Sequence, residues 1–307
     1  MKNVECFKIR LYEKELHDNW NVISENDDVL LTIPCEKDGK SNPVIIVADP
    51  FLYVYQDELY LFYEEKRLFT PGVLRMVKTR NLKEWTKPVT VLQEPFHLSY
   101  PFVFEDNGKI FMIPETSEAG EVRLYQADDE GLTHFTQTDT LLAHQKVDEH
   151  ISIDYSDSSV FRKDGKYYLM TTLEIDGVNQ LFLYTSDHLN GPYNEHPSSP
   201  VCISKNYGRN AGSLIQYGEK LYRVAQDCES RYGDNVHLFE VKDLSESFYS
   251  EELVKENLYN GSIPFYKEGG HQLNVIEFQR RQIIATDAKE YRSFLLTRIL
   301  KKLIDLF

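Results

Sequence analysis

The chain has 307 residues, of which 41% are hydrophobic and 27% charged, a balance that is typical of a folded globular protein and excludes an intrinsically disordered one. Its formal net charge of −15 excludes general nucleic-acid binding, because an acidic surface repels phosphate backbones. No stretch approaches 18 consecutive apolar residues and the N-terminus contains no apolar signal-peptide core, so we expect a soluble, cytoplasmic protein.

One sequence pattern recurs five times along the chain. Each copy has a small or acidic start, a strand, a polar turn and a second strand rich in aromatic residues. The copies begin near residues 49, 100, 157, 211 and 271, which is a period of 51 to 60 residues. The turns at 56–58, 106–108 and 163–165 contain Asp, Asn or Gly, which tolerate the positive φ of tight hairpins. The sequence therefore predicts five β-hairpins.

A second, weaker pair of strands follows each of the first four copies, as in residues 72–92 and 120–142. Four strands in about 50 residues make one propeller blade, so the sequence predicts an all-β, five-bladed β-propeller over residues 1–291. The fifth copy lacks its second pair, and residues 8–24 carry a similar pattern. We therefore expect the N-terminal strands to complete the last blade and close the ring. A β-sandwich of meandering strands is the alternative.

Residues 292–307 have a different pattern. Apolar residues recur there at helical spacing from Leu295 to Phe307, while Arg298, Lys301 and Lys302 lie on the other side. This pattern predicts a short, basic amphipathic helix of the kind that lies in a membrane interface. Packing against the propeller, a second subunit or a partner transferase is the alternative. A peripheral position at the inner membrane face therefore stays open beside a cytoplasmic one.

In a propeller the first strand of each blade lines the central channel, so the five repeat starts converge on one axis. The residues expected there are Asp49, Tyr100, Asp157, Arg209, Asn210 and His271. Those expected at the ends of the second strands of blades two and four are Glu115, Gln226 and Asp227. Two or three carboxylates at one pocket are the minimum for acid–base work on a glycosidic or phosphate bond. A structural role for each acid, such as capping a turn, is the alternative.

Residues 48–50 (ADP) and 157–161 (DSSVF) resemble the blade starts of glycoside hydrolase family 43 and its five-bladed relatives. The resemblance implies that Asp49 is the general base and that Asp157 tunes and orients the acid. It also implies an axial histidine near a bound ion or water, here His271. A divalent ion beside His271 stays open, with a hydrogen-bonded core histidine as the alternative. The sequence has no zinc-spaced cluster, so neither a metal site nor another cofactor is predicted.

A closer resemblance covers most of the chain. Segments 99–101, 114–115, 196–201, 209–212, 222–233 and 270–271 are together similar to the N-terminal domain of glucosamine inositolphosphorylceramide transferases. Related bacterial proteins are associated with surface-polysaccharide synthesis. The resemblance implies the propeller fold strongly and the reaction only indirectly, because in the larger enzymes this domain lies beside a separate transferase domain.

The chain departs from the hydrolase family in blade four. The family has a catalytic glutamate there, but residues 208–212 read GRNAG and contain no carboxylate. Without a proton donor, an inverting hydrolase loses on the order of 10²–10⁴-fold in rate, unless Glu115 or Asp227 takes over. Arg209 instead offers a planar cationic donor suited to a phosphate or carboxylate. An ion pair of Arg209 with Asp157 or Asp227 is the alternative.

Three functions follow from these features. The first is glycosyl transfer in surface-polysaccharide or glycolipid synthesis, from an anionic nucleotide- or lipid-phosphate sugar donor in the channel. The second is a non-catalytic propeller that binds an oligosaccharide for a partner transferase. The third is a glycosidase whose acid is displaced to Glu115. In each, Tyr100 and Tyr232 are candidates for stacking on a sugar ring.

Overall fold

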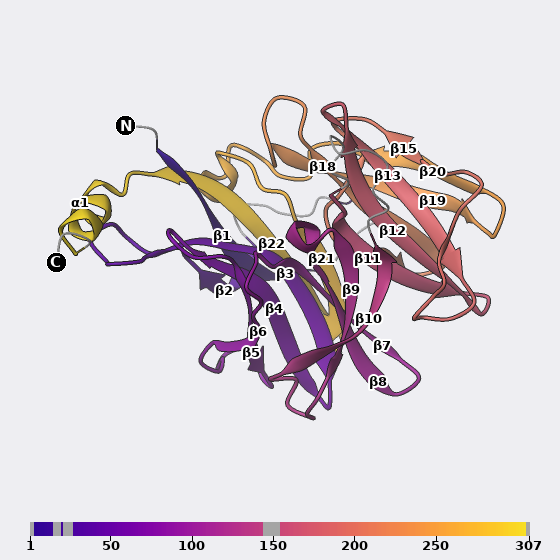
Figure 1. Ribbon diagram of the computed structural model, residues 1–307, viewed down its shortest axis with the longest axis horizontal. Helices are drawn as coiled ribbons and strands as arrows, with labels where there is room; N and C mark the ends of the chain where they lie inside the picture. The colour runs from indigo at the N-terminus through magenta and orange to yellow at the C-terminus, as the bar shows by residue number, and fades with distance from the viewer. Residues whose placement is uncertain (1–2, 15–19, 21–26, 144–153, 305–307) are drawn as a thin grey trace.

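The computed structural model describes residues 3–14, 20, 27–143 and 154–304. Its strands form five antiparallel sheets, each built around one repeat of the sequence (Figure 1). The molecule is therefore an all-β, five-bladed β-propeller, as the sequence predicts.

In each of the first four blades, the strands follow one another in chain order from the centre of the ring to its edge. Blade one consists of β3 (Val44–Tyr55), β4 (Glu58–Arg67), β5 (Val73–Thr79) and β6 (Val89–Leu92). Blade two consists of β7 (Ser99–Asp106), β8 (Lys109–Glu115), β9 (Glu121–Ala127) and β10 (Phe135–Ala143). Blade three consists of β11 (Ser156–Lys163), β12 (Lys166–Ile175), β13 (Val178–Ser186), β14 (Asn194–Glu195) and β15 (Cys202–Ile203). Blade four consists of β16 (Arg209–Asn210), β17 (Ile215–Tyr217), β18 (Lys220–Asp227), β19 (Asn235–Leu244) and β20 (Tyr249–Lys255).

The fifth blade joins the two ends of the chain. It consists of β21 (Leu273–Phe278), β22 (Arg281–Arg292), β1 (Val4–Glu13) and β2 (Asp28–Ile33). β1 pairs with β22 along its whole length, so the predicted closure of the ring by N-terminal strands is confirmed. The second of these strands lies later than predicted, because the alternating run that pairs with β1 is DVLLTI at 28–33. Part of the predicted segment, residues 15–19 and 21–24, lies outside the described residues.

The hairpin turns have the backbone that their residues favour. Asn107 and Gly108 have φ of 51° and 76°, and Asp164 and Gly165 have φ of 51° and 82°. Two successive positive φ values match the right-handed twist of the flanking strands. These turns set the register of each hairpin, and with it which side chains lie at the channel end of the strand.

The inner strands of blades one to three share an unusual kink. Asp49, Tyr100 and Asp157 have φ of 52°, 49° and 53°, in the left-handed region that residues other than glycine seldom adopt. At each of them the pairing with the second strand of the blade shifts register. A β-bulge of this kind re-aims a side chain. Left-handed backbone costs free energy in residues other than glycine, and residues strained in this way cluster at functional sites. The three equivalent residues are therefore held in place by the surrounding sheet.

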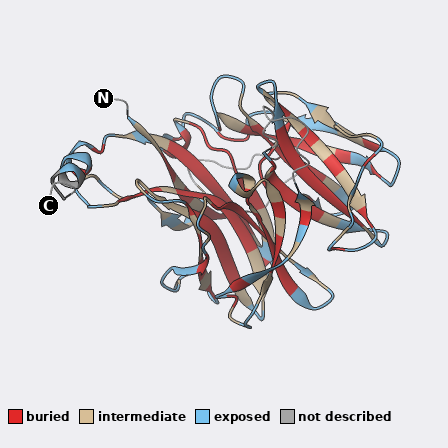
Figure 2. Cartoon of the chain, viewed as in Figure 1, coloured by how far each residue is buried: buried red, intermediate tan, exposed pale blue. Residues whose placement is uncertain are grey.

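The buried apolar residues form a shell between adjacent blades (Figure 2). The largest cluster joins blades one to three, and a second joins blades four and five. A buried ion pair lies within this shell in blade four, where Arg223 donates to both oxygens of Glu251 at 2.7 and 2.5 Å. The shell makes the propeller a rigid frame for the residues at its axis.

One α-helix and two 3₁₀ helices complete the described structure. The 3₁₀ helices are Ser117–Ala119 and Pro264–Tyr266, and α1 (Leu295–Ile304) projects from the end of β22 (Figure 1). The predicted C-terminal helix is thus present. Within the described residues, no helix has both the length and the apolar character needed to span a membrane.

Candidate functional site

The predicted axial residues come together at the centre of the ring. The backbone N–H of Tyr100 donates to Oδ2 of Asp49 at 3.1 Å, which links blade two to blade one. The backbone N–H of Asp157 donates to Oε2 of Glu115 at 3.2 Å, which links blade three to blade two. The carboxylates of Asp49 and Glu115 thus each fix the bulge of the next blade. They connect neighbouring blades as well as lining the central channel.

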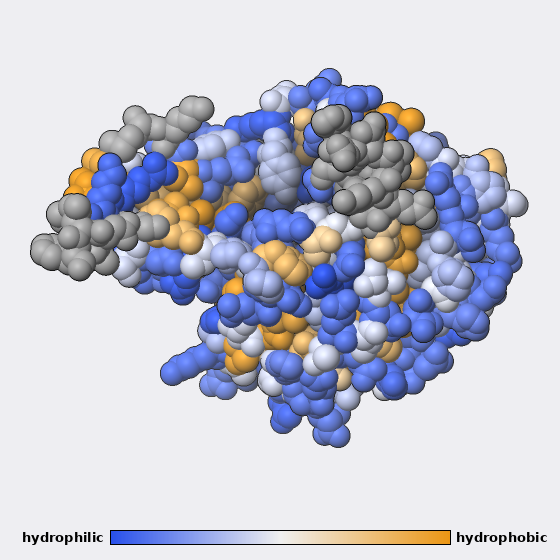
Figure 3. Space-filling view, viewed as in Figure 1, coloured by the Kyte–Doolittle hydropathy of each residue, from blue (hydrophilic) through white to orange (hydrophobic). Residues whose placement is uncertain are grey.

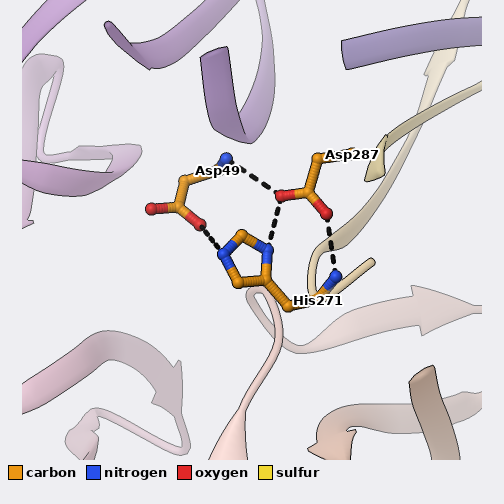
Figure 4. A group of neighbouring side chains, drawn as sticks. All are labelled: Asp49, His271 and Asp287. Atoms are coloured by element: carbon orange, nitrogen blue, oxygen red, sulfur yellow. Dashed lines mark hydrogen bonds and ion pairs between the residues drawn. The ribbon is translucent and has the colours of Figure 1, made fainter. Parts of the chain in front are cut away.

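A buried histidine lies between two aspartates in the centre of the site (Figure 4). Nδ1 of His271 is 2.6 Å from Oδ2 of Asp287, and Nε2 is 3.7 Å from Oδ1 of Asp49. The side chains of His271 and Asp287 are 4% and 0% exposed, so neither charge is compensated by water. The three residues form a chain of ionisable groups that joins blade five to blade one.

Asp287 accepts more hydrogen bonds than the other two members of this chain. Its Oδ1 accepts the backbone N–H groups of His271 at 2.8 Å and Gln272 at 3.2 Å. Its Oδ2 accepts the backbone N–H of Asp49 at 3.2 Å and also contacts the imidazole. Asp287 therefore ties the backbone of blade five to that of blade one beneath His271.

The electrostatics of the group favour a charged histidine. Burial lowers the pKa of His271, but the nearby carboxylates of Asp287, Asp49 and Asp157 raise it to about 9. Burial raises the pKa of Asp49 well above its ordinary value; the His271 cation opposes this rise, and neighbouring carboxylates add to it. With a pKa of about 9, the His271 imidazole is protonated at neutral pH.

A second cluster surrounds Arg209. Its Nε donates to Oδ2 of Asp157 at 2.6 Å, and its Nη2 lies 3.7 Å from Oε2 of Glu115. Burial raises the pKa of Asp157, Arg209 lowers it and Glu115 raises it, to about 7. Asp157 is therefore an ion-pair partner of Arg209, and it is one of the two partners that the sequence left open. The alternative partner, Asp227, makes no such contact among the described interactions.

The other residues predicted in blade four divide between the site and its periphery. Asn210 donates from Nδ2 to the carbonyl of Asp157 at 2.9 Å and is buried. Gln226 lies opposite Arg209 in the sheet. Asp227 instead lies 3.5 Å from Nε2 of His237 and accepts the backbone N–H of Glu229. The structure therefore brings Asn210 to the axial cluster and directs Asp227 away from it.

Tyr232 forms part of the exposed rim of the site. Its ring is 5.2 Å from the guanidinium of Arg209 and meets the ring of His271 edge-on at 5.2 Å. Phe7, from β1, stacks on His271 at 4.5 Å and meets the ring of Tyr232 edge-on at 6.4 Å. Tyr232 is 40% exposed, so its aromatic surface is accessible beside the buried charges. Tyr100, in contrast, is 1% exposed and has a buried hydroxyl without a hydrogen-bond partner.

Three further site residues were not predicted. Glu64 lies opposite Ala48 just as Glu115 lies opposite Ser99, so it is the blade-one equivalent of Glu115. It is buried, and its Oε1 is 3.2 Å from Nε2 of His97. Asp287, described above, is the blade-five member of the same set. Applying the repeat register to every blade would have identified Glu64 and Asp287. His97 lies in a loop, where no repeated sequence pattern indicates a site residue.

The group of Asp49, His271 and Asp287 offers three ligand atoms within 4.8 Å of one another, so we asked whether it suits a divalent ion. Both oxygens of Asp287 are already used by three backbone N–H groups and by the imidazole. Only Nε2 of His271 and Oδ1 of Asp49 remain to bind an ion, because Oδ2 of Asp49 accepts the backbone N–H of Tyr100. Two protein ligands are few for a resident cation, and the residues fit an internal ion-pair chain better than a metal centre.

Comparison with known protein families gives a match over most of the chain. Residues 15–287 match the model described as "Glucosamine inositolphosphorylceramide transferase 1, N-terminal". The rice (Oryza sativa subsp. japonica) protein of that name is 37% identical over 221 residues, which cover 68% of this chain and 28% of the relative. The Arabidopsis thaliana protein is 33% identical over 217 residues, covering 68% and 27%. This chain thus corresponds to little more than a quarter of the curated relatives.

Several solved structures with a similar fold are glycoside hydrolases. A family 43 enzyme of Bacillus licheniformis superposes with a TM-score of 0.52 at 17% identity, covering 69% of this chain and 44% of that chain. A family 117 enzyme of Zobellia galactanivorans superposes with a TM-score of 0.55 at 13% identity, covering 93% and 90%. At such identities the likeness extends to the fold alone.

Proposed function

This chain belongs to the family of the glucosamine inositolphosphorylceramide transferase N-terminal domain, and on that premise we propose that its central site binds the glycan of a glycolipid or surface polysaccharide during its synthesis. The observation that carries the proposal is the composition of the site. Five buried or nearly buried acids surround few cations, next to an exposed tyrosine ring; the acids are Asp49, Glu64, Glu115, Asp157 and Asp287.

Carboxylates and an aromatic surface are the groups that recognise a neutral sugar. A sugar hydroxyl donates a short, strong hydrogen bond to an ionised carboxylate. The apolar face of a sugar ring packs on an aromatic ring such as that of Tyr232, which is the most exposed of the central aromatic residues. This combination supports a hydroxyl-rich ligand that enters from the side of Tyr232.

The charge balance argues against a phosphate deep in the site. Arg209 already faces two carboxylates, those of Asp157 at 2.6 Å and Glu115 at 3.7 Å. An anionic donor would have to displace one of them, which leaves a buried carboxylate unpaired. The role of Arg209 toward a nucleotide- or lipid-phosphate donor therefore stays a prediction, and we propose that the sugar occupies the centre while any phosphate lies outside.

Glycosyl transfer or hydrolysis is the second candidate, favoured by one observation. The pKa of Asp157, raised to about 7, makes its carboxyl able to give and take a proton at neutral pH. Asp49 would then be the base. Glu115, the other candidate acid, accepts the backbone N–H of Asp157 with its Oε2, which lies 3.7 Å from Nη2 of Arg209.

Calorimetric titration of the purified protein tests the proposal. The probes are a panel of neutral oligosaccharides that includes inositol-linked sugars, nucleotide-sugars, and inorganic phosphate. We expect binding of at least one neutral glycan, with its affinity reduced tenfold or more in Asp49→Asn. Asp164→Asn is the matched control, since Asp164 lies in an exposed turn with the same positive φ and makes no site contact.

Each outcome of the titration has a meaning. Binding of the nucleotide-sugar alone, lost in Arg209→Ala, would contradict the neutral-sugar site and support transfer from an anionic donor. Turnover of an activated sugar, measured in the same samples and lost in Asp157→Asn, would establish the second candidate. No binding of any glycan in the panel would overturn the proposal.

A further inference from the structure

We propose that α1 docks the propeller on an anionic membrane surface, with the central site held close to the lipid headgroups. The proposal concerns a surface that the glycan site does not use, and it holds or fails independently of glycan binding. If both are correct, the ligand of the site is a membrane-embedded glycolipid rather than a free sugar.

The exposed face of α1 is apolar. Leu295, Leu296 and Ile299 are 40%, 59% and 46% exposed. Thr297, in the same turn, is fully buried. The helix therefore turns Thr297 toward the propeller and the side chains of Leu295, Leu296 and Ile299 outward, where water solvates them poorly.

The first turn of α1 is fixed to the propeller body. Asp38 accepts the backbone N–H groups of Leu296 at 3.0 Å and Thr297 at 2.9 Å, and the hydroxyl of Thr297 at 2.8 Å. Phe294, just before the helix, is 2% exposed and packs with Cys6, Cys35 and Ile45. These two attachments set the direction in which the apolar face points. The outward exposure of Leu295 and Leu296 is therefore determined by the folded structure.

The charge of the helix selects an anionic surface as its partner. The chain has 34 basic and 49 acidic residues, but α1 has the sequence LLTRILKKLI, with three basic residues and no acid. Arg298 and Lys302 are exposed next to the apolar face. An anionic membrane repels the body of the protein and attracts this helix, because basic residues near an amphipathic face bind anionic lipids. A second copy of this acidic chain offers no such complementarity.

The position of α1 places it on the same side of the ring as the site. β22 contributes Asp287 to the site and runs on to Arg292, where it pairs with Val4 of β1. β3 and β4 likewise extend past the site, from the pair Ala48 and Glu64 to the pair Val44 and Arg67. Blades one and five thus form a ridge beyond the site, and α1 lies at its end (Figure 1). The view in Figure 3 shows apolar surface gathered along this projecting part.

Vesicle flotation tests the docking surface. The probes are vesicles of phosphatidylcholine alone and of phosphatidylcholine with phosphatidylglycerol. We expect the protein to float with the anionic vesicles only, less so as salt is raised, and to lose at least tenfold in binding in the double variant Leu296→Glu, Ile299→Glu. Ile203→Glu is the matched control, because Ile203 is also 59% exposed but lies in blade three.

The outcomes separate this proposal from its rivals. Absence of flotation, equal flotation with neutral vesicles, or equal loss in the control variant would each overturn it. A dimer seen by light scattering that the double variant dissociates, without vesicle binding, would assign the face to a second copy. Because both variants lie outside the channel, their glycan affinity in solution should match that of the unmodified chain, so a failure of the glycan site would be seen separately.

Discussion

Nε2 of His271 lies 3.7 Å from Oδ1 of Asp49, so the fifth repeat and the first, which are neighbours in the closed ring, meet at its centre through a buried pair of ionisable groups. Asp287 supports the pair from the other side of the imidazole, and through its acceptance of the Asp49 N–H it also fixes the backbone on which Asp49 stands. The geometry ties the protonation of the site to the closure of the propeller.

The stability of the protein should fall as pH rises from 6.5 to 9. The folded-state pKa of His271, about 9, lies above the unfolded value of about 6.5. The stabilising contribution is therefore complete below pH 6.5 and is lost as pH rises through 9, with a magnitude of roughly 3 kcal/mol. Urea unfolding at pH 6.5, 8 and 9.5 measures it. In His271→Gln this part of the slope should disappear, and an unchanged slope in that variant would contradict the assignment.

Removal of the Arg209 side chain should destabilise the fold strongly. Arg209→Ala leaves the carboxylates of Asp157 and Glu115 without their cation in a buried site, and breaking a buried pair costs about 3–5 kcal/mol. Arg162→Ala is the comparison, because Arg162 pairs with Asp106 at 3.4 Å but its side chain is 52% exposed. Such a surface pair contributes less than about 1 kcal/mol. Similar losses in the two variants, by chemical unfolding, would show that Arg209 is not a structural cation.

The aromatic ring of Tyr232 should contribute to glycan binding. We expect Tyr232→Ala to weaken binding about 3- to 10-fold and Tyr232→Phe to keep most of the affinity, because stacking needs the ring rather than the hydroxyl. Tyr291→Ala is a matched control, since Tyr291 is 41% exposed against 40% for Tyr232 but lies beyond the site on β22. Affinities come from the calorimetric titration; equal effects of the Ala and Phe variants would rule out stacking.

Divalent cations should not stabilise the folded protein. Asp287 has no oxygen free for a metal, so we expect melting temperatures in chelator, in Ca²⁺ and in Mg²⁺ to agree once ionic strength is matched. A cation at 100 times its dissociation constant would stabilise the fold by about 2.7 kcal/mol, which a thermal melt resolves easily. A rise in melting temperature that Asp49→Asn abolishes would overturn this expectation and establish a metal site.

Much of the fold could be predicted because propeller blades repeat. The period, the turn residues and the fifth copy without its second strand pair together specify five blades and a ring closed by β1. The place of β2 could not be predicted as well, because an edge strand with one partner has a weak burial pattern, and that of β2 contains no buried residue. The family resemblance, carried by segments in four blades, is confirmed by the match over residues 15–287.

The site could be predicted only in part. Asp49, Tyr100 and Asp157 stand at equivalent repeat positions and were predicted together. The direction of Asp227 was not evident, because successive residues of a strand point to opposite faces and Gln226 takes the place opposite Arg209. Phe7 stacks on His271 from a strand more than 260 residues away, and no local pattern records such a contact.

The pairing of β1 with β22 also determines the order in which the molecule can be built. β1 leaves the ribosome before its partner β22, and four blades are synthesised between the two, so the buried residues Ile9 and Leu11 of β1 wait until β22 has been made. Until then four blades form an open arc, with apolar edges that favour aggregation. His271 and Asp287 arrive with the same late segment. A chain interrupted before this point would contain folded blades but no complete channel, so ring closure and assembly of the site are one event.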